Sequence, residues 1–163
     1  MYMNTKKLTK AAAVASIYVA MTMLLPMLGY GPIQFRISEI LTLLAFYNPI
    51  YVPAITVGVA ISNLASPLGM IDVIFGSLHS LISLWCMSRT KNIWHASLYP
   101  ALFSFIIGAE IVLFSPEPLS FIAVSLQIMT SELIIVTLIG VPVFKILERH
   151  PIFRDIVLNP DYH

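Results

Sequence analysis

Two long stretches of this chain carry no charged side chain, residues 11–35 and residues 40–71. A helix needs about 20 apolar residues to cross a lipid bilayer, and both stretches are longer than that. The composition agrees, since 58% of the 163 residues are hydrophobic, 10% are charged and the mean hydropathy is +0.89. Such values lie outside the range of ordinary soluble domains. The sequence therefore predicts an all-α integral membrane protein.

Breaks in the apolar pattern divide the chain into six predicted transmembrane helices. Asn48-Pro49 splits the second uncharged stretch, "SPLG" and "SPEP" are predicted turns, and Pro142 is expected to kink the last helix. The basic N-terminus also resembles a signal peptide, but more hydrophobic segments follow it and no small-residue cleavage site closes the first one. We expect one membrane domain, 1–163, with helices at about 8–27, 37–48, 50–65, 71–88, 93–114 and 119–148 and a tail, 149–163.

The distribution of basic residues predicts the orientation in the membrane. Six helices would place both termini on one side, and eight of the nine Lys and Arg residues fall on that side. Positive charge is concentrated in the cytoplasmic loops of membrane proteins. We therefore predict a multi-pass protein of the cell membrane with cytoplasmic termini and an external Arg36. The eight residues are Lys6, Lys7, Lys10, Arg89, Lys91, Lys145, Arg149 and Arg154.

Several function classes find no support in the sequence. The net charge of +1 gives no bulk attraction to nucleic acid, and the single Cys86 excludes an internal disulfide and argues against a structural zinc site. A GxxxxGK[ST] phosphate loop, an HExxH motif and a GxSxG motif are all absent. We expect no cofactor, metal site or catalytic residue in this chain. The remaining classes are a binding module driven by an external motor and a passive channel.

Four acidic residues are predicted in the outer half of the helices, where Arg36 is the one base. Glu132 lies about 14 residues into the last helix, or ~21 Å from its start. A charge at that depth costs roughly 2.5 to 3.5 kcal/mol, so such a group is expected to face the bundle interior and serve a function. A cationic, hydrogen-bond-donating small molecule would suit these acids. The alternatives are a protonated or paired structural glutamate, and helix capping for those near helix starts. The four are Glu39, Asp72, Glu110 and Glu132.

One face of the predicted fourth helix could line a pocket. Its residues recur at helical spacing, and a phenyl ring one turn below a carboxylate could stack on a flat heterocycle. Ordinary helix packing is the alternative, and for His79 a hydrogen-bonded core position is favoured over a ligand contact. Gln127, and Gln34 in a loop, are outward amides that could read a purine-like edge. The residues of this face are Asp72, Phe75, Gly76, His79 and Ser83.

Small residues form a smooth patch on the first helix. Ala11 and Ala15 are one turn apart, and either internal packing or docking of another protein explains them equally well. A rival function of a different class is an intramembrane enzyme, with His79 as base and Ser83 as nucleophile one turn away.

Three sequence blocks resemble a known family. "GPIQFRISEI" at 31–40, "SNLASPLGMIDVIFGSL" at 62–78 and "SELIIVTLIGVPVFKIL" at 131–147 are similar to the queuosine-precursor transporter (QueT) family, in the same order. The resemblance implies the substrate-binding S component of an energy-coupling factor (ECF) transporter. It implies a six-helix fold, uptake of 7-aminomethyl-7-deazaguanine or a relative such as queuine, and partnership with a transmembrane T component and two cytoplasmic ATPase subunits. ATP and magnesium would be bound by those ATPases.

The resemblance also implies residue roles. Such S components dock through an AxxxA patch on helix one, which Ala11 and Ala15 match. The residues that match the family pattern in the expected pocket are Arg36, Glu39, Asp72, Phe75, Glu110 and Glu132. His79 departs from it, since a small residue is usual there. The ligand carries an ammonium group and a guanine edge with adjacent N–H donors, so one carboxylate could pair with each. Which acid takes which role stays open, and Arg36 could hold Glu39 or donate to the ring carbonyl.

Overall fold

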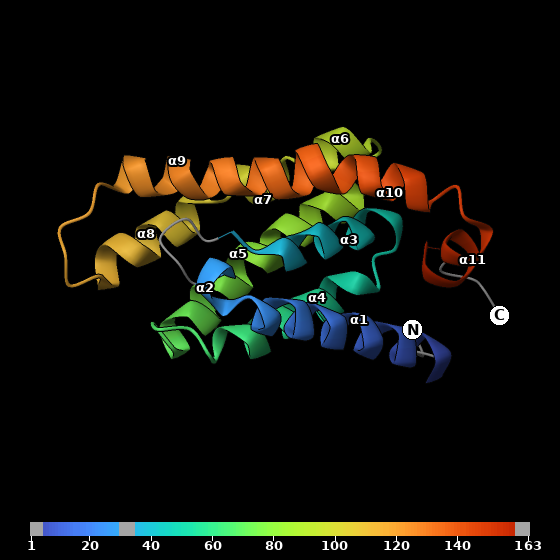
Figure 1. The fold of residues 1–163 in the computed structure, drawn as a ribbon, viewed down its shortest axis with the longest axis horizontal. Coiled ribbons are helices and arrows are strands. Elements are labelled where there is room, and N and C mark those ends of the chain that lie inside the picture. The colour runs from blue at the N-terminus through green and yellow to red at the C-terminus, as the bar shows by residue number, and fades with distance from the viewer. Residues whose placement is uncertain (1–4, 30–34, 159–163) are drawn as a thin grey trace.

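The computed structural model describes residues 5–29 and 35–158, which are helical with short connections and contain no strand. The predicted domain 1–163 also includes residues 1–4, 30–34 (with Gln34) and 159–163, which lie outside the described residues. The long segments lie along one axis and alternate in direction, so the start of α1 and the region of α11 are at the same end (Figure 1). In chain order the elements are α1 (Thr5–Leu24), α2 (Pro26–Gly29), the 3₁₀ helix η1 (Ile37–Leu43), α3 (Leu44–Tyr47), α4 (Tyr51–Asn63), α5 (Met70–Arg89), α6 (Ile93–Ala96), α7 (Tyr99–Leu102), α8 (Phe105–Phe114), α9 (Phe121–Glu132), the π-helical η2 (Leu133–Gly140), α10 (Val141–Leu147), α11 (Pro151–Phe153) and η3 (Arg154–Leu158).

Within residues 5–29 and 35–158, four helical segments are long and apolar enough to cross a membrane. The segments Ile37–Tyr47 and Tyr51–Asn63 are apolar but shorter. The 13 residues of α4 span roughly 20 Å at 1.5 Å per residue, against a hydrocarbon core of about 30 Å. The all-helical membrane class is thus supported with four candidate spans, while six crossings and cytoplasmic termini remain predictions. The four segments are Thr5–Leu24, Met70–Arg89, Ile93–Phe114 and Phe121–Leu147.

The last long segment changes its helical winding before its proline. The chain runs through α9, widens into η2 and returns to α-helix in α10, where Pro142 occupies the first turn. Proline lacks a backbone N–H and clashes with the carbonyl four residues earlier, so an α-helical turn there is strained. The wider π turns leave more room for the ring. A π-helical stretch thus lies on the N-terminal side of Pro142, and the expected kink of this helix stays a prediction.

The start of α5 depends on a close contact with the end of α4. Asn63 donates a hydrogen bond from Nδ2 to the backbone oxygen of Asp72 at 2.8 Å. A Cβ atom added at Gly76 would lie 2.2 Å from that same Nδ2. The missing side chain at Gly76 is therefore what lets Asn63 reach the first turn of α5, and this contact fixes where Asp72 is held.

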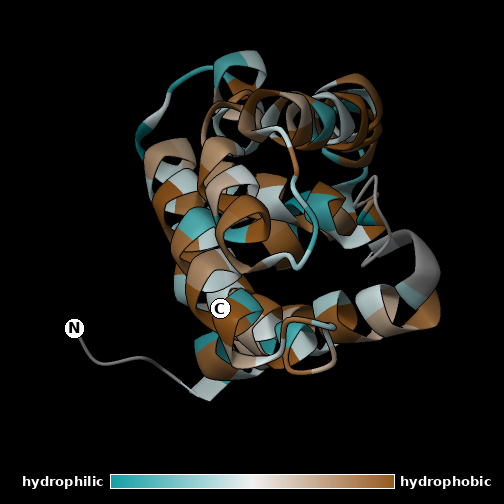
Figure 2. Cartoon of the chain, turned by 90° about the vertical axis from the view of Figure 1, so that its left-hand side faces the viewer, coloured by the Kyte–Doolittle hydropathy of each residue, from teal (hydrophilic) through white to brown (hydrophobic). Residues whose placement is uncertain are grey.

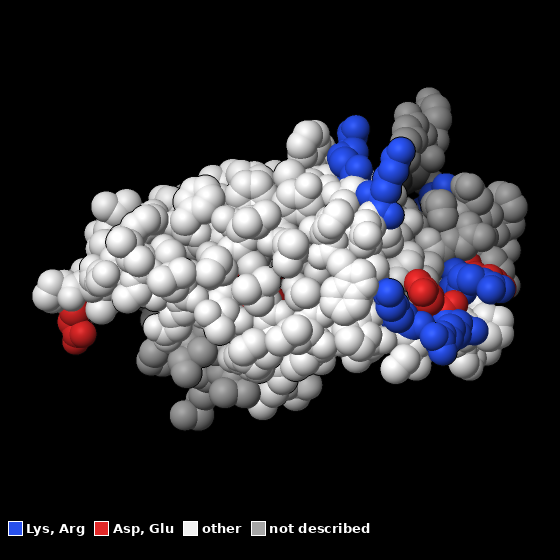
Figure 3. Space-filling model, turned by 90° about the horizontal axis from the view of Figure 1, so that it is seen from above, with Lys and Arg blue, Asp and Glu red and all other residues white. Residues whose placement is uncertain are grey.

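Many apolar side chains are exposed along the bundle, and on the face shown in Figure 3 charge lies toward the ends. Figure 2 shows mostly hydrophobic ribbon around the bundle, and large apolar side chains such as Leu24, Leu113 and Ile146 are exposed. In Figure 3 the basic side chains gather at one end, and the middle of the face carries almost no charge. We call the end that carries them the basic end. This pattern suits a protein surrounded by lipid.

Two exposed tryptophans mark the basic end. The guanidinium carbon of Arg89 lies 5.3 Å from the centre of the Trp85 ring, and Lys145 Nζ lies 5.3 Å from the centre of the Trp94 ring. Tryptophan and long basic side chains collect at the membrane–water interface, where an apolar body meets a wet polar tip. The two pairs are consistent with a membrane boundary at this level.

The small-residue patch of α1 packs against α4 in the chain itself. Ala11 is 7% exposed, and a Cβ atom at Gly58 of α4 would lie 3.1 Å from the Ala15 backbone oxygen. The neighbouring Ala12 and Ala13 are exposed. Internal packing, one of the two sequence-based readings, therefore applies to Ala11 and Ala15, and the docking role stays a prediction.

The described part of the tail folds back on the bundle. Tyr47 donates a hydrogen bond to Glu148 Oε2 at 2.7 Å, and Tyr51 donates one to the Val157 backbone oxygen at 2.6 Å. Leu158 is buried in the same cluster as Tyr51. These contacts join the tail to α3 and α4 at the basic end.

Candidate functional site

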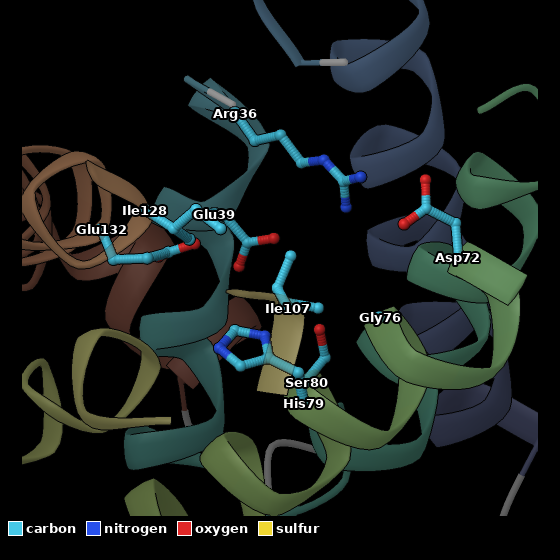
Figure 4. A pocket seen from close by; sticks show the side chains of 9 residues that line it. All are labelled: Arg36, Glu39, Asp72, Gly76, His79, Ser80, Ile107, Ile128 and Glu132. Atoms are coloured by element: carbon cyan, nitrogen blue, oxygen red, sulfur yellow. The ribbon is translucent and has the colours of Figure 1, made fainter. Parts of the chain in front are cut away.

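A small polar pocket lies inside the bundle between η1, α5, α8 and α9. Figure 4 shows side chains from these elements pointing toward a common space, with Arg36 above it and His79 and Ser80 below it. Its volume of about 20 Å³ is room for roughly one water molecule. The lining residues are Arg36, Glu39, Asp72, Gly76, His79, Ser80, Ile107, Ile128 and Glu132.

Glu39 enters this pocket from η1 and is held by α1. It is 3% exposed, and its Oε1 accepts a short hydrogen bond from the hydroxyl of Tyr18, which is fully buried. One turn further along α1, Thr22 Oγ1 lies 2.7 Å from Ser38 Oγ. Two side-chain contacts thus tie η1 to α1 beside the pocket.

Asp72 enters from the opposite wall, in the first turn of α5. It is 4% exposed and its Oδ2 accepts a short hydrogen bond from Ser66. The first turn of a helix also favours an acidic side chain through the helix dipole, so this alternative role of Asp72 stays open. The carboxylate also lines the pocket.

Glu110 lies beside Asp72 but behind the pocket lining. It is completely buried on α8, close enough to Asp72 for the two carboxyl groups to interact. Two ionised carboxylates cannot donate to one another, and neither Glu110 oxygen has another hydrogen-bond partner among the described residues. Like charges this close need a proton or a cation between them.

Glu132 completes the acidic walls from the last turn of α9. It is 7% exposed, it is near both Glu39 and Arg36, and its Oε2 has no hydrogen-bond partner within the described ranges. An unsatisfied buried polar atom costs about 1–3 kcal/mol, and more when it is charged. The deep, inward-facing glutamate predicted from its position in the sequence is present.

Arg36 brings the one basic side chain that lines the pocket. Its Nε donates to the Gly29 backbone oxygen at 3.2 Å. The guanidinium extends over the space between Glu39 and Asp72 (Figure 4). One guanidinium therefore faces a pocket with three carboxylates, Glu39, Asp72 and Glu132, and the pocket is acidic overall.

His79 lies at the floor of the pocket and is also hydrogen-bonded to the core. Its Nε2 is 2.9 Å from the Pro100 backbone oxygen, which fits a neutral ring with its proton on that nitrogen. The Ser83 hydroxyl is buried and makes no hydrogen bond within the described residues. The base–nucleophile contact that the enzyme alternative needs is therefore not formed.

Two predicted pocket residues lie elsewhere. Phe75 packs edge-on against Phe114, with ring centres 6.0 Å apart, and does not line the pocket. Gln127 lines a second, more open pocket of about 350 Å³, with Phe35 and Ser131. The described ranges contain no group of three or more His, Cys, Asp or Glu side chains that could hold a metal ion.

Sequence reasoning missed four residues around the pocket. Ser80 is one turn after Gly76, and that helical spacing was a readable signal. Ile107 and Ile128 come from α8 and α9 and supply the apolar part of the lining. Tyr18 is 21 residues before Glu39, and nothing in the sequence indicates that the two meet.

The pocket is too small for a bicyclic ligand in this conformation. A purine-sized molecule displaces far more than the roughly 20 Å³ present, so its walls would have to separate. The structure therefore shows a closed form of the site, and its carboxylates suit a cationic ligand with several hydrogen-bond donors.

Comparisons with known proteins agree with one another. The family model described as QueT transporter matches residues 8–149. A curated relative, the queuosine precursor transporter QueT of Lactococcus lactis subsp. cremoris (strain MG1363), is 39% identical over 120 residues, which cover 69% of this chain and 70% of that protein. No solved structure is significantly similar to this chain.

Proposed function

The chain belongs to the QueT transporter family, and on that premise we propose that it captures a queuosine precursor for import. The family makes it a membrane transport protein. The observation that carries the substrate proposal is the convergence of buried carboxylates from η1, α5 and α9 on one pocket with a single guanidinium. The substrate class is 7-aminomethyl-7-deazaguanine, queuine or a close relative.

The chemistry of that ligand suits the acidic pocket. Its ammonium group would pair with one carboxylate, and its guanine N1–H and exocyclic amine would donate together to another. The Arg36 guanidinium would donate to the ring carbonyl or keep Glu39 in place. The unsatisfied Glu132 oxygen and the Asp72–Glu110 pair are the carboxylates most in need of such donors.

Energy for uphill transport would come from partner proteins. The chain contains no phosphate loop, so we propose that it is the S component of an ECF transporter, with a T component and two ATPase subunits as partners. Vesicles that contain only this chain should bind the deazaguanine without accumulating it, and addition of the partners with ATP should start uptake. Accumulation by the chain alone would contradict this assignment.

Partner docking at α1 has its own test. A pair of substitutions, Ala11→Trp with Ala15→Trp, should abolish uptake by the assembled transporter. If the patch docks a partner, ligand binding by the isolated chain should persist. If it only packs against α4, binding and thermal stability should fall together. Ala12→Trp on the exposed face is the matched control.

A further inference from the structure

One buried tyrosine, Tyr18, contacts the pocket residue Glu39 but does not itself line the pocket. Tyr18 has no exposed surface, and it is absent from the residues that line the cavity. Its hydroxyl nevertheless donates to Glu39 Oε1. In this closed form Tyr18 reaches the pocket only through its hydrogen bond to Glu39.

The surroundings of Tyr18 fix its hydroxyl in place. The ring belongs to the main apolar core, which also contains Leu43 and Val59. A Cβ atom at Gly58 would lie 3.4 Å from the Tyr18 Cβ, so α4 packs directly against this turn of α1. Thr22 Oγ1 donates to the Tyr18 backbone oxygen at 2.9 Å. A ring held on several sides keeps its hydroxyl at one point in space.

A fixed hydroxyl restricts the carboxylate that it binds. Glutamate has several side-chain torsions, and ordering a long side chain on binding costs conformational entropy. Glu39 is already ordered, because Tyr18 occupies one of its oxygens, and its carboxylate points toward the pocket (Figure 4). A ligand would then meet a carboxylate in its binding position.

We propose that Tyr18 is a positioning residue for substrate recognition, holding the Glu39 carboxylate toward the pocket. The role rests on the proposed function, since it presumes that Glu39 contacts the transported ligand. It also gives α1 a part in the substrate site, although no side chain of α1 lines the pocket.

The test removes only the phenolic oxygen. Purified full-length chain carrying Tyr18→Phe should bind 7-aminomethyl-7-deazaguanine about tenfold more weakly than the wild type by calorimetric titration. Tyr51→Phe is the matched control, because Tyr51 is equally buried and also donates one hydrogen bond, but to the tail at the basic end. It should bind normally. Thr22→Val is a second control, since it removes the neighbouring hydrogen bonds to Ser38 and to the Tyr18 backbone oxygen but leaves the phenolic hydroxyl that donates to Glu39. It should change affinity less than twofold.

Thermal melts without ligand separate positioning from general stability. The proposal predicts that Tyr18→Phe loses affinity out of proportion to its melting temperature, compared with both controls. A ligand-free infrared difference spectrum adds a second readout, in which Tyr18→Phe should shift a carboxylate stretching band that Glu39→Gln removes. Wild-type affinity in Tyr18→Phe, or an equal loss in Thr22→Val, would overturn this role alone. A wild-type chain that binds no deazaguanine would instead overturn the proposed function on which the role depends.

Discussion

The pocket and the basic end treat buried polar groups in opposite ways. At the basic end Tyr47 and Tyr51 both have hydrogen-bond partners, Glu148 and the Val157 backbone. Around the pocket, both Glu110 oxygens and one Glu132 oxygen lack a hydrogen-bond partner within the described residues. The same chain therefore satisfies its polar groups in one region and leaves acids unsatisfied in the other.

The difference indicates what each region is for. A buried polar atom without a partner destabilises a fold by about 1–3 kcal/mol. A region that only holds the fold together would not keep several such atoms, whereas a binding site keeps them for the donors of a ligand. We therefore assign stability to the basic end and recognition to the pocket, and the predictions below test that division.

The largest effect is expected for Glu132→Gln. Loss of a charge-assisted hydrogen bond of roughly 1.5 to 3 kcal/mol should weaken binding of the aminomethyl base about 10- to 100-fold. Because Glu132 Oε2 has no hydrogen-bond partner within the described residues and Gln keeps the shape of the side chain, the ligand-free melting temperature should stay unchanged or rise. Titration and a thermal melt of the same sample measure both.

The directions in which affinity and melting temperature change are more informative than the size of either change. If Glu132 were a structural group, the substitution would lower stability and binding together. A stable variant with unchanged affinity would remove Glu132 from the site.

Gly76→Ala should lower both the stability of the fold and the affinity for the ligand, because Gly76 packs against the residue that holds Asp72 in place. The new Cβ would lie 2.2 Å from Asn63 Nδ2 and displace it from the Asp72 backbone oxygen. We expect a loss of about 1–3 kcal/mol in the free energy of unfolding. Affinity should fall several-fold as Asp72 shifts. Leu78→Ala, on the exposed side of α5, is the control and should do neither.

Tyr51→Phe should lower stability alone. Loss of its hydrogen bond to Val157 removes about 1 kcal/mol and should make the tail more accessible to protease. Limited proteolysis followed by mass spectrometry measures the release of the tail. A clear change in ligand affinity would break the division between the two ends.

The smallest effect is expected for Trp94→Leu at the basic end. The Lys145 contact with this ring is partly exposed, so its loss should change stability by no more than about 0.5–1 kcal/mol. Ligand affinity should stay within error. Equal or larger destabilisation than in Tyr51→Phe would contradict the order proposed here.

Local patterns in the sequence predicted much of this site. The deep Glu132 and three residues of one helical face, Asp72, Gly76 and His79, line the same pocket, whereas Phe75 and Ser83 of that face do not. Their roles in binding stay predictions. Periodicity works here because each helix must turn its polar residues away from lipid. Arg36 and Glu39, which the family resemblance implied for the site, line the same pocket.

Contacts between distant elements could not be predicted in this way. Tyr18 and Glu39 meet because α1 packs on η1, and Phe75 turns from the pocket because Phe114 of α8 takes up its ring. Spacing within one helix carries no information about either contact. The lengths of the helices were also hard to predict from the sequence. Apolar runs predicted six crossings, whereas Ile37–Tyr47 and Tyr51–Asn63 are shorter than the four candidate spans.

The most direct test of the central claim compares two ligands that differ by one ammonium group. Purified chain should be titrated with 7-aminomethyl-7-deazaguanine and with a neutral 7-methyl analogue by calorimetry. An acidic pocket built for a cationic heterocycle predicts that the aminomethyl base binds at least tenfold more tightly, and that added salt weakens it little because the carboxylates are buried. Equal affinity for both ligands, or no binding of either, would contradict the account.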